Sequence, residues 1–240
     1  MNLPALLLLT AVGAACINQR VDALTIDQII DALMGGSPPH WKVMFDLDSS
    51  GSINAVEWND SIQAARDTLS IIDNTPAAVS VHPDRHRIGL VRFSSTAVTQ
   101  VIFSLGTHGF FLGNDLAIAG VVKVAGATNT VLGLHLCEIE FGGSGKRLVW
   151  MTTDGKSNQG GDPVAKAKLM QKKGIVICVV AVGPDADMVE INGMASKIMI
   201  PGYRRPQLCV LEFESFQAYK TAARDARSRV VSARRNRRIN

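Results

Sequence analysis

Oxygen-bearing side chains are concentrated in one short stretch, FDLDSSGSINAVEW, which runs from residue 45 to residue 58. It contains two aspartates, three serines and a glutamate at short spacings, and it has no histidine or cysteine. Carboxylate and hydroxyl oxygens are the ligands that hard cations such as Mg²⁺ and Ca²⁺ take in proteins. The stretch therefore predicts a cation site, and no nucleophile or acid–base pair accompanies it.

Two different cation motifs fit this stretch. Counted from Asp46, it reads D-x-D-x-S-G-x-I-x-x-x-E, which matches an EF-hand calcium loop that ends in Glu57. Counted from Asp48, it reads D-x-S-x-S, and its two serines are Ser50 and Ser52. The motifs share most of their residues, so the flanking sequence has to decide between them.

The flanking sequence favours the second motif. An EF-hand needs a helix on each side of its loop. The preceding residues, GGSPPHWKVMF, break a helix and are then typical of a strand, and no second calcium loop follows. An EF-hand-like calcium-binding module that uses residues 46–57 is kept as the alternative hypothesis.

Strand-like and helix-like segments alternate through most of the chain. Residues 86–93 and 96–103 are β-prone and are separated by two serines, which predicts an antiparallel hairpin. Residues 175–183 form an unbroken apolar run, which is typical of a central parallel strand. Helices are predicted between the strands, for example at 58–72 and 162–174. We therefore expect an α/β fold with a doubly wound, mostly parallel central sheet of about six strands, one antiparallel edge strand, and helices on both faces.

The two ends of the chain differ in composition from the rest. The run LPALLLLTAVGAAC is too short to cross a bilayer well and is followed by small residues. We predict a secretory signal peptide over residues 1–23, with candidate cut points after Ala15 or after Ala23. Residues 24–40 are amphipathic, end in GGSPP, and are predicted to be a linker. Residues 221–240 are predicted to be the end of the last helix and a basic, solvated tail.

The charge is unevenly distributed. The formal net charge is +4, and the last 20 residues contribute +6, which leaves −2 for the rest. Aromatic residues do not alternate with the arginines of the tail, so we expect no nucleic-acid partner.

No later segment is long and apolar enough to predict a transmembrane helix. The absence of G-x-G-x-x-G after the first strand argues against a cofactor-binding enzyme of the same architecture.

The four cysteines are predicted to be buried thiols where they remain in the mature chain. Cys178 lies in the apolar run, and Cys137 and Cys209 also have apolar neighbours. Free cysteine behaves as a small hydrophobe. The sparse, irregular spacing does not indicate a disulfide framework, and a zinc site would need closer pairs of ligands. Cys16 leaves with the signal peptide or becomes the mature N-terminus.

Five blocks of the sequence, in order, resemble the von Willebrand factor type A domain, also called the integrin I-like domain. The resemblance covers residues 41–220. The blocks are VMFDLDSSGSI, RIGLVRFSS, GATNTVLGL, RLVWMTTDGKSN and GIVICVVAVG. They resemble, in turn, the first strand of that family with its D-x-S-x-S loop, the second strand, the G-x-T-x-T loop, the fourth strand with its T-D-G turn, and the fifth strand.

The resemblance implies a metal-ion-dependent adhesion site. By position, Asp48, Ser50 and Ser52 match its first motif. Thr128 matches the threonine of the second motif, and Asp154 matches the aspartate of the third. In the family, the serine and threonine hydroxyls face a magnesium ion, and the aspartates act mostly through bound waters. The implied cofactor is Mg²⁺, with Mn²⁺ or Ca²⁺ as substitutes.

The implied chemistry is adhesion. Open α/β sheets bind their ligands at the carboxyl ends of the strands, where all three loops are expected to lie. A shell made mainly of neutral hydroxyls leaves the charge of the ion largely uncancelled, so the ion can bind a carboxylate. The resemblance thus implies a secreted, non-enzymatic module that captures an Asp or Glu of a partner, such as an extracellular matrix or cell-surface protein.

One residue departs from the family pattern beside the site. The family usually has an apolar residue where this chain has Asp46. Asp46 and Asp48 are expected to lie on the same face of their strand, because side chains alternate along a strand. We therefore expect Asp46 to add negative charge behind the site, which would strengthen cation binding and weaken capture of an anionic ligand.

Overall fold

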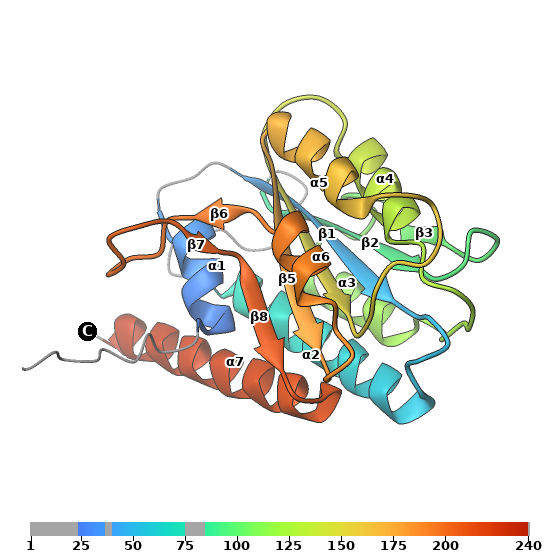
Figure 1. Ribbon diagram of the computed structural model, residues 1–240. Helices are drawn as coiled ribbons and strands as arrows, with labels where there is room; N and C mark the ends of the chain where they lie inside the picture. Colours follow the sequence, from blue (N-terminus) through green and yellow to red (C-terminus); the bar gives the residue numbers. More distant parts are fainter. Residues whose placement is uncertain (1–23, 37–39, 75–84, 240) are drawn as a thin grey trace, which may run out of the picture.

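The computed structural model describes residues 24–36, 40–74 and 85–239 (Figure 1). The predicted signal peptide, including Cys16, lies outside these residues. A six-stranded sheet in the described part has the order β3-β2-β1-β4-β5-β8. Its strands are β1 (Trp41–Asp48), β2 (Arg87–Phe93), β3 (Gln100–Phe103), β4 (Lys146–Thr153), β5 (Ile175–Val182) and β8 (Val210–Phe213).

The strand directions confirm the predicted sheet. Neighbouring strands are parallel except for β2 and β3, which form the expected antiparallel edge hairpin. A separate small sheet pairs β6 (Lys197–Ile198) with β7 (Gln207–Leu208). The fold class is therefore α/β, as predicted.

Helices cover both faces of the sheet (Figure 1). One face packs against α1 (Ile26–Met34), α2 (Ala55–Asp73), α3 (Phe111–Ala119) and α7 (Phe216–Ile239). The other packs against α4 (Thr130–Phe141), α5 (Pro163–Lys172) and α6 (Met188–Met194). None of the described helices combines the length and the apolar character that crossing a membrane requires.

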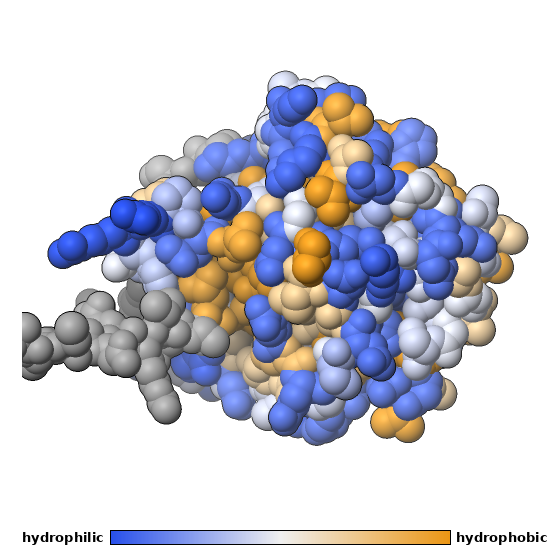
Figure 2. Space-filling model, viewed as in Figure 1, coloured by the Kyte–Doolittle hydropathy of each residue, from blue (hydrophilic) through white to orange (hydrophobic). Residues whose placement is uncertain are grey.

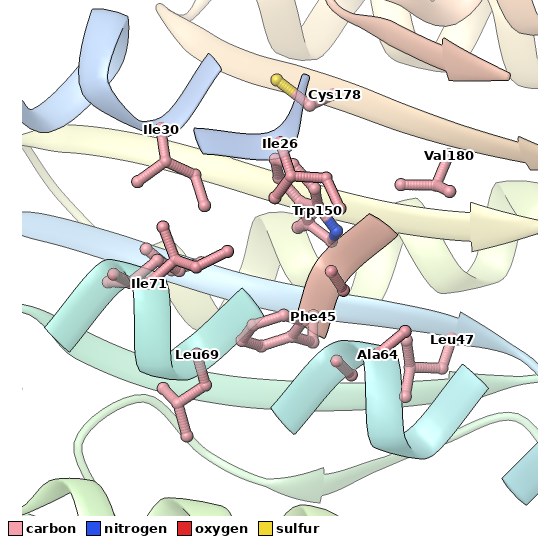
Figure 3. Packing of buried hydrophobic residues seen from close by; sticks show 14 of the residues in the cluster. Ile26, Ile30, Phe45, Leu47, Ala64, Leu69, Ile71, Trp150, Cys178 and Val180 are labelled. Carbon is pink, nitrogen blue, oxygen red and sulfur yellow. The ribbon is translucent and has the colours of Figure 1, made fainter. Parts of the chain in front are cut away.

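The alternation of side chains along β1 and β4 builds the core. Phe45 lies in the cluster that contains α2 and α7, whereas its neighbour Met44 lies in the cluster under α4 and α5. Figure 3 shows Phe45 and Trp150 inside the first cluster. Burying each large apolar side chain contributes about 1.5–3 kcal/mol. The indole N–H of Trp150 also donates to the hydroxyl of Tyr219 at 3.2 Å, which ties α7 to the centre of the sheet.

The predicted linker, residues 24–40, is wrong for its described part, because α1 belongs to the core. Thr25 and Gln28 form a capping box that starts the helix. Ile26, Ile29 and Ile30 are fully buried in the same cluster as α2 and α7. The amphipathic pattern of this segment therefore forms a docking face, and α1 packs into the same core as α2 and α7.

The last helix continues through the segment predicted as a helix end and basic tail, and most of its described residues beyond Val230 are exposed. α7 continues to Ile239, and three of its arginines contact the domain. Arg227 pairs with the buried Asp67 at 2.8 Å, and Arg229 pairs with Asp27 at 2.8 Å. Arg234 donates to the side chain of Asn74 at 2.8 Å. Part of the positive charge of the tail thus offsets acidic groups on α1 and α2.

Cys178 and Cys209 form a disulfide, so the prediction of free thiols is wrong at these two positions. The parallel register of β5 and β8 places Val179 beside Val210, and the two cysteines precede this pair. Their Cα atoms are 4.7 Å apart, a separation that a disulfide spans. Cys137 is a free, buried thiol, as predicted.

Candidate metal-ion centre

Three loops meet at the carboxyl ends of β1 and β4, which are adjacent and parallel. Backbone hydrogen bonds hold these loops together. In the first loop, Gly51 N donates to the carbonyl of Gly126 in the second loop at 2.9 Å. In the third loop, Asn158 N and Gln159 N donate to the carbonyl of Thr128 at 3.0 and 3.2 Å. The fold thus positions the three predicted motifs against one another.

Four of the five predicted site residues form one connected group. Asp48 Oδ1 accepts a hydrogen bond from Ser50 N at 2.8 Å. The hydroxyl oxygens of Ser50 and Ser52 are 3.0 Å apart. Ser52 Oγ in turn donates to Asp154 Oδ1 at 3.0 Å. The first and third motifs are therefore in direct side-chain contact.

Thr128, the fifth residue, is positioned through its backbone. Its N–H donates to Asn158 Oδ1 at 2.8 Å, and its carbonyl accepts from the loop that follows Asp154. The side chain is buried. Within the described residues, no hydrogen bond joins its hydroxyl to the other four site residues, so a direct role of this hydroxyl stays a prediction.

Thr153, the threonine of the T-D-G turn, also contacts this group, although only the aspartate of that turn was predicted as a site residue. Its hydroxyl donates to Asp48 Oδ2 at 2.7 Å. Because Ser50 N occupies Oδ1, both carboxylate oxygens of Asp48 are engaged by the protein. This fixes the orientation of Asp48 and leaves it better suited to hold an ion through water than directly. The available signal was its place in the T-D-G motif, directly before Asp154.

The surroundings of the site disfavour the ionised forms of its two carboxyl groups. Burial raises the pKa of Asp48 to about 6, although hydrogen bonds from Thr153 and Ser50 oppose the shift. Burial also raises the pKa of Asp154, and the nearby charge of Glu57 adds to the shift. A bound cation would favour the ionised forms and reverse both effects. The electrostatics of the site therefore fit a positively charged ligand.

The donor set fits a hard divalent ion. Its five side chains offer two carboxylates and three hydroxyls, which are all oxygen donors of the type that Mg²⁺ prefers. Among the described residues, no group of three or more His, Cys, Asp and Glu side chains is arranged to bind a metal ion. With two carboxylates among its five side chains, the set would give an ion few charged protein ligands.

The EF-hand alternative is wrong. A strand, β1, leads into the loop where an EF-hand requires a helix. Glu57, which would be the last calcium ligand, instead accepts a hydrogen bond from Asn54 N at 2.8 Å in the capping box of α2. Its carboxylate therefore serves the start of the helix.

Asp46 is buried without a hydrogen-bond partner. Its side chain is completely buried, and neither carboxylate oxygen has a partner within the part of the chain that the structure describes. Gly133 on α4 makes room for it, because a Cβ there would lie 2.8 Å from Asp46 Oδ1. Burial raises the pKa of Asp46 well above its usual value, and the charge of Asp48 adds to this. The raised pKa favours the neutral form, which opposes the expected negative charge behind the site.

Replacing Asp46 with valine is expected to raise the free energy of unfolding by about 1–3 kcal/mol, because an unpaired buried polar group is removed. The gain should grow with pH. A carboxyl group whose pKa is higher in the folded than in the unfolded state stabilises the fold at low pH. This stabilisation is lost as the pH rises from the pKa of the unfolded state through that of the folded state. Urea unfolding in chelator between about pH 5 and 8 measures both effects.

Asp46→Asn is the matched control, since it removes the charge but keeps an unpaired polar side chain. It should give a smaller gain than Asp46→Val. A valine variant less stable than the natural chain at the upper end of this pH range would show that Asp46 is paired.

The α/β fold and the group of oxygen-bearing side chains at the carboxyl ends of its strands together define an adhesion-type module. A family model for the von Willebrand factor type A domain matches residues 42–223, and the chain belongs to this family. It is a family of adhesion domains that bind protein ligands and are not enzymes. A search of curated proteins gives no match.

Solved structures show the same fold at low sequence identity. Proximal thread matrix protein 1 from the mussel byssus is similar over 79% of this chain and 47% of its own, with a TM-score of 0.64 and 21% identity. It has also been solved with a zinc-occupied MIDAS motif, its metal-ion-dependent adhesion site. This chain spans about half the length of the mussel protein.

Two further structures come from a parasite and a bacterium. The manganese-loaded Plasmodium vivax TRAP protein is similar over 78% of this chain and 73% of its own, with a TM-score of 0.59 and 15% identity. The pilus adhesin SpaC from Lactobacillus rhamnosus GG, in its open conformation, is similar over 82% and 31%, with a TM-score of 0.59 and 13% identity. At these identities the similarity establishes the fold.

Proposed function

We propose that this domain captures an acidic side chain of a partner protein through a Mg²⁺ ion. The residues that would hold the ion are Asp48, Ser50, Ser52, Thr128 and Asp154. The observation that carries the proposal is the composition of this set, in which hydroxyls outnumber carboxylates and Asp48 has both oxygens engaged by the protein. An ion with so few anionic ligands keeps net positive charge, which the carboxylate of a partner can neutralise.

Each residue has a distinct role in the proposal. The hydroxyls of Ser50, Ser52 and Thr128 face the ion, while Asp48 and Asp154 hold it mainly through water. The bound ion would supply the positive charge that bridges the domain and the partner. The N-terminus of α2, which begins at Ala55, adds the positive end of a helix dipole on the same side.

Mg²⁺ is the proposed ion, and Mn²⁺ or Ca²⁺ are the proposed substitutes. An all-oxygen set that leaves room for water suits Mg²⁺, which sheds its waters reluctantly. The manganese and zinc named for two similar structures support a divalent ion at the corresponding site.

The proposed setting is extracellular, and the proposed partner is an extracellular matrix or cell-surface protein. The disulfide between Cys178 and Cys209 supports an oxidising compartment. The similarity to a byssus matrix protein and a pilus adhesin supports the partner class. A nucleic-acid partner is not proposed, because Arg227 and Arg229 are engaged in ion pairs.

Capture of soluble matrix proteins by the immobilised domain tests the proposal. Capture is expected in millimolar Mg²⁺ and is expected to be lost in excess chelator. Asp154→Ala should abolish it while the far-UV circular dichroism stays unchanged. Asp31→Ala, which removes an exposed carboxylate on α1, is the matched control and should leave capture intact. Capture that survives chelation would contradict the metal bridge.

A further inference from the structure

The sheet has a free edge at β8. This strand pairs with β5 on one side only. The carbonyls of Cys209 and Phe213 accept hydrogen bonds from the β5 side. Backbone groups alternate sides along a strand, so Val210 and Glu212 direct their N–H and C=O groups away from β5. Among the described residues no hydrogen bond reaches these outward groups, which makes them a template for another strand.

A groove runs beside this free edge. It has a volume of about 580 Å³, within the range of pockets that hold small ligands or a short peptide. Its walls come from β8, α7 and the residues that lead into α1, and Figure 2 shows apolar surface over α1 and β8. The apolar lining residues are Leu24, Ile26, Val210, Leu211, Phe213 and Ala222.

The lining of the groove also carries net negative charge, with two acidic residues and one basic residue. Glu212 and Asp225 line it, and neither forms an ion pair with any residue that the structure describes. Arg229 lines it too, but its guanidinium is held by Asp27 through two hydrogen bonds of 2.8 and 3.1 Å. An occupant that is apolar on one side and carries a basic side chain would therefore fit.

We propose that residues 17–23, INQRVDA, occupy this groove and extend the sheet beyond β8. They lie outside the described residues, but they directly precede Leu24, which lines the groove. Apolar Val21 and Ala23 alternate with polar residues, as in a half-buried strand. Arg20 supplies a basic side chain for the acidic wall, and Asp22 lies on the same face of the segment, two residues closer to Leu24.

The length of the segment fits as well. Extended chain advances about 3.3 Å per residue, so seven residues reach about 23 Å, which exceeds the length of the four-residue β8. The segment survives on a secreted chain only if the leader is cut after Ala15, because a cut after Ala23 would remove it. Covering the edge would keep β8 from pairing with other chains. This goes beyond the proposed function, since β8 carries none of the five metal-site residues.

Hydrogen exchange of single backbone amides tests the proposal. Two chains are compared, one that begins at residue 16 with Cys16→Ser and one that begins at Leu24. The outward amides of Val210 and Glu212 are expected to exchange at least about tenfold more slowly in the longer chain. The amides of Leu211 and Phe213, which face β5, are built-in controls and should be equally protected in both.

Charge reversal sharpens the test. Arg20→Glu in the longer chain should remove most of the added protection, whereas Arg205→Glu, the same change at an exposed loop position, should not. Equal exchange in both chains would overturn the proposal. Protection that appears in the shorter chain only at high concentration would assign the edge to a second copy and also overturn it. Finding that the secreted protein starts at Leu24 would also overturn the proposal, because residues 17–23 would then be absent from it. Both chains contain the five metal-site residues, so their Mg²⁺ affinity tests the proposed function independently of the edge proposal.

Discussion

Thr128→Ala is expected to weaken Mg²⁺ and Mn²⁺ binding by about 10–100-fold. Hydrogen bonds of the Thr128 backbone N–H and carbonyl fix its loop against the Asp154 loop, and its side chain is buried there. Alanine keeps the backbone contacts and removes only the oxygen and a methyl group. Isothermal titration of the folded domain with each ion measures the loss.

Glu57→Gln is the matched control for this experiment. Glutamine can still accept the hydrogen bond from Asn54 N that closes the capping box, so the start of α2 is kept. Because Glu57 serves the helix, ion affinity should change by less than about threefold, a change in binding free energy of about 0.6 kcal/mol. A large loss with Glu57→Gln and none with Thr128→Ala would contradict the assigned site.

The parts of the fold that depend on local pattern could be predicted from the sequence. The β-branched, apolar run at 175–182 is typical of a strand that is covered on both faces, and it forms β5. Asp162, Pro163 and Gly174 delimit a helix by capping chemistry, and α5 lies between them. Asp48, Ser50 and Ser52 are close in sequence, so the strand end brings them together directly.

The parts that depend on how distant segments pair could not be predicted. The contact between Thr153 and Asp48 needs the register of β1 against β4. The docking of α1 needs the apolar side of α7, which lies nearly a whole chain away. Asp46 is a different case, since nothing in its local sequence shows that its strand face is covered by Gly133 on α4. Sequence patterns show which residues are apolar or polar, and tertiary contacts decide their partners.

The disulfide is the second feature whose removal should have a large effect. Replacing Cys178 and Cys209 together with alanine is expected to lower the free energy of unfolding by about 3–4 kcal/mol. The bridge joins residues that are 31 positions apart and thereby restricts the unfolded chain, which is the main source of its stabilisation. The enclosed segment contains α6, β6 and β7, and these elements should lose hydrogen-exchange protection first.

Urea unfolding with and without a reductant separates the bridge from simple packing. Reductant should destabilise the natural chain by a similar amount and leave the double variant unchanged. Cys137→Ala is the control, because it removes a buried sulfur without opening a loop and should cost less. Mg²⁺ affinity should persist in the double variant wherever it stays folded, since Asp48 and Asp154 are held by β1 and β4. Equal stability of the natural chain and the double variant would mean that the register of β5 and β8 alone holds this edge of the sheet.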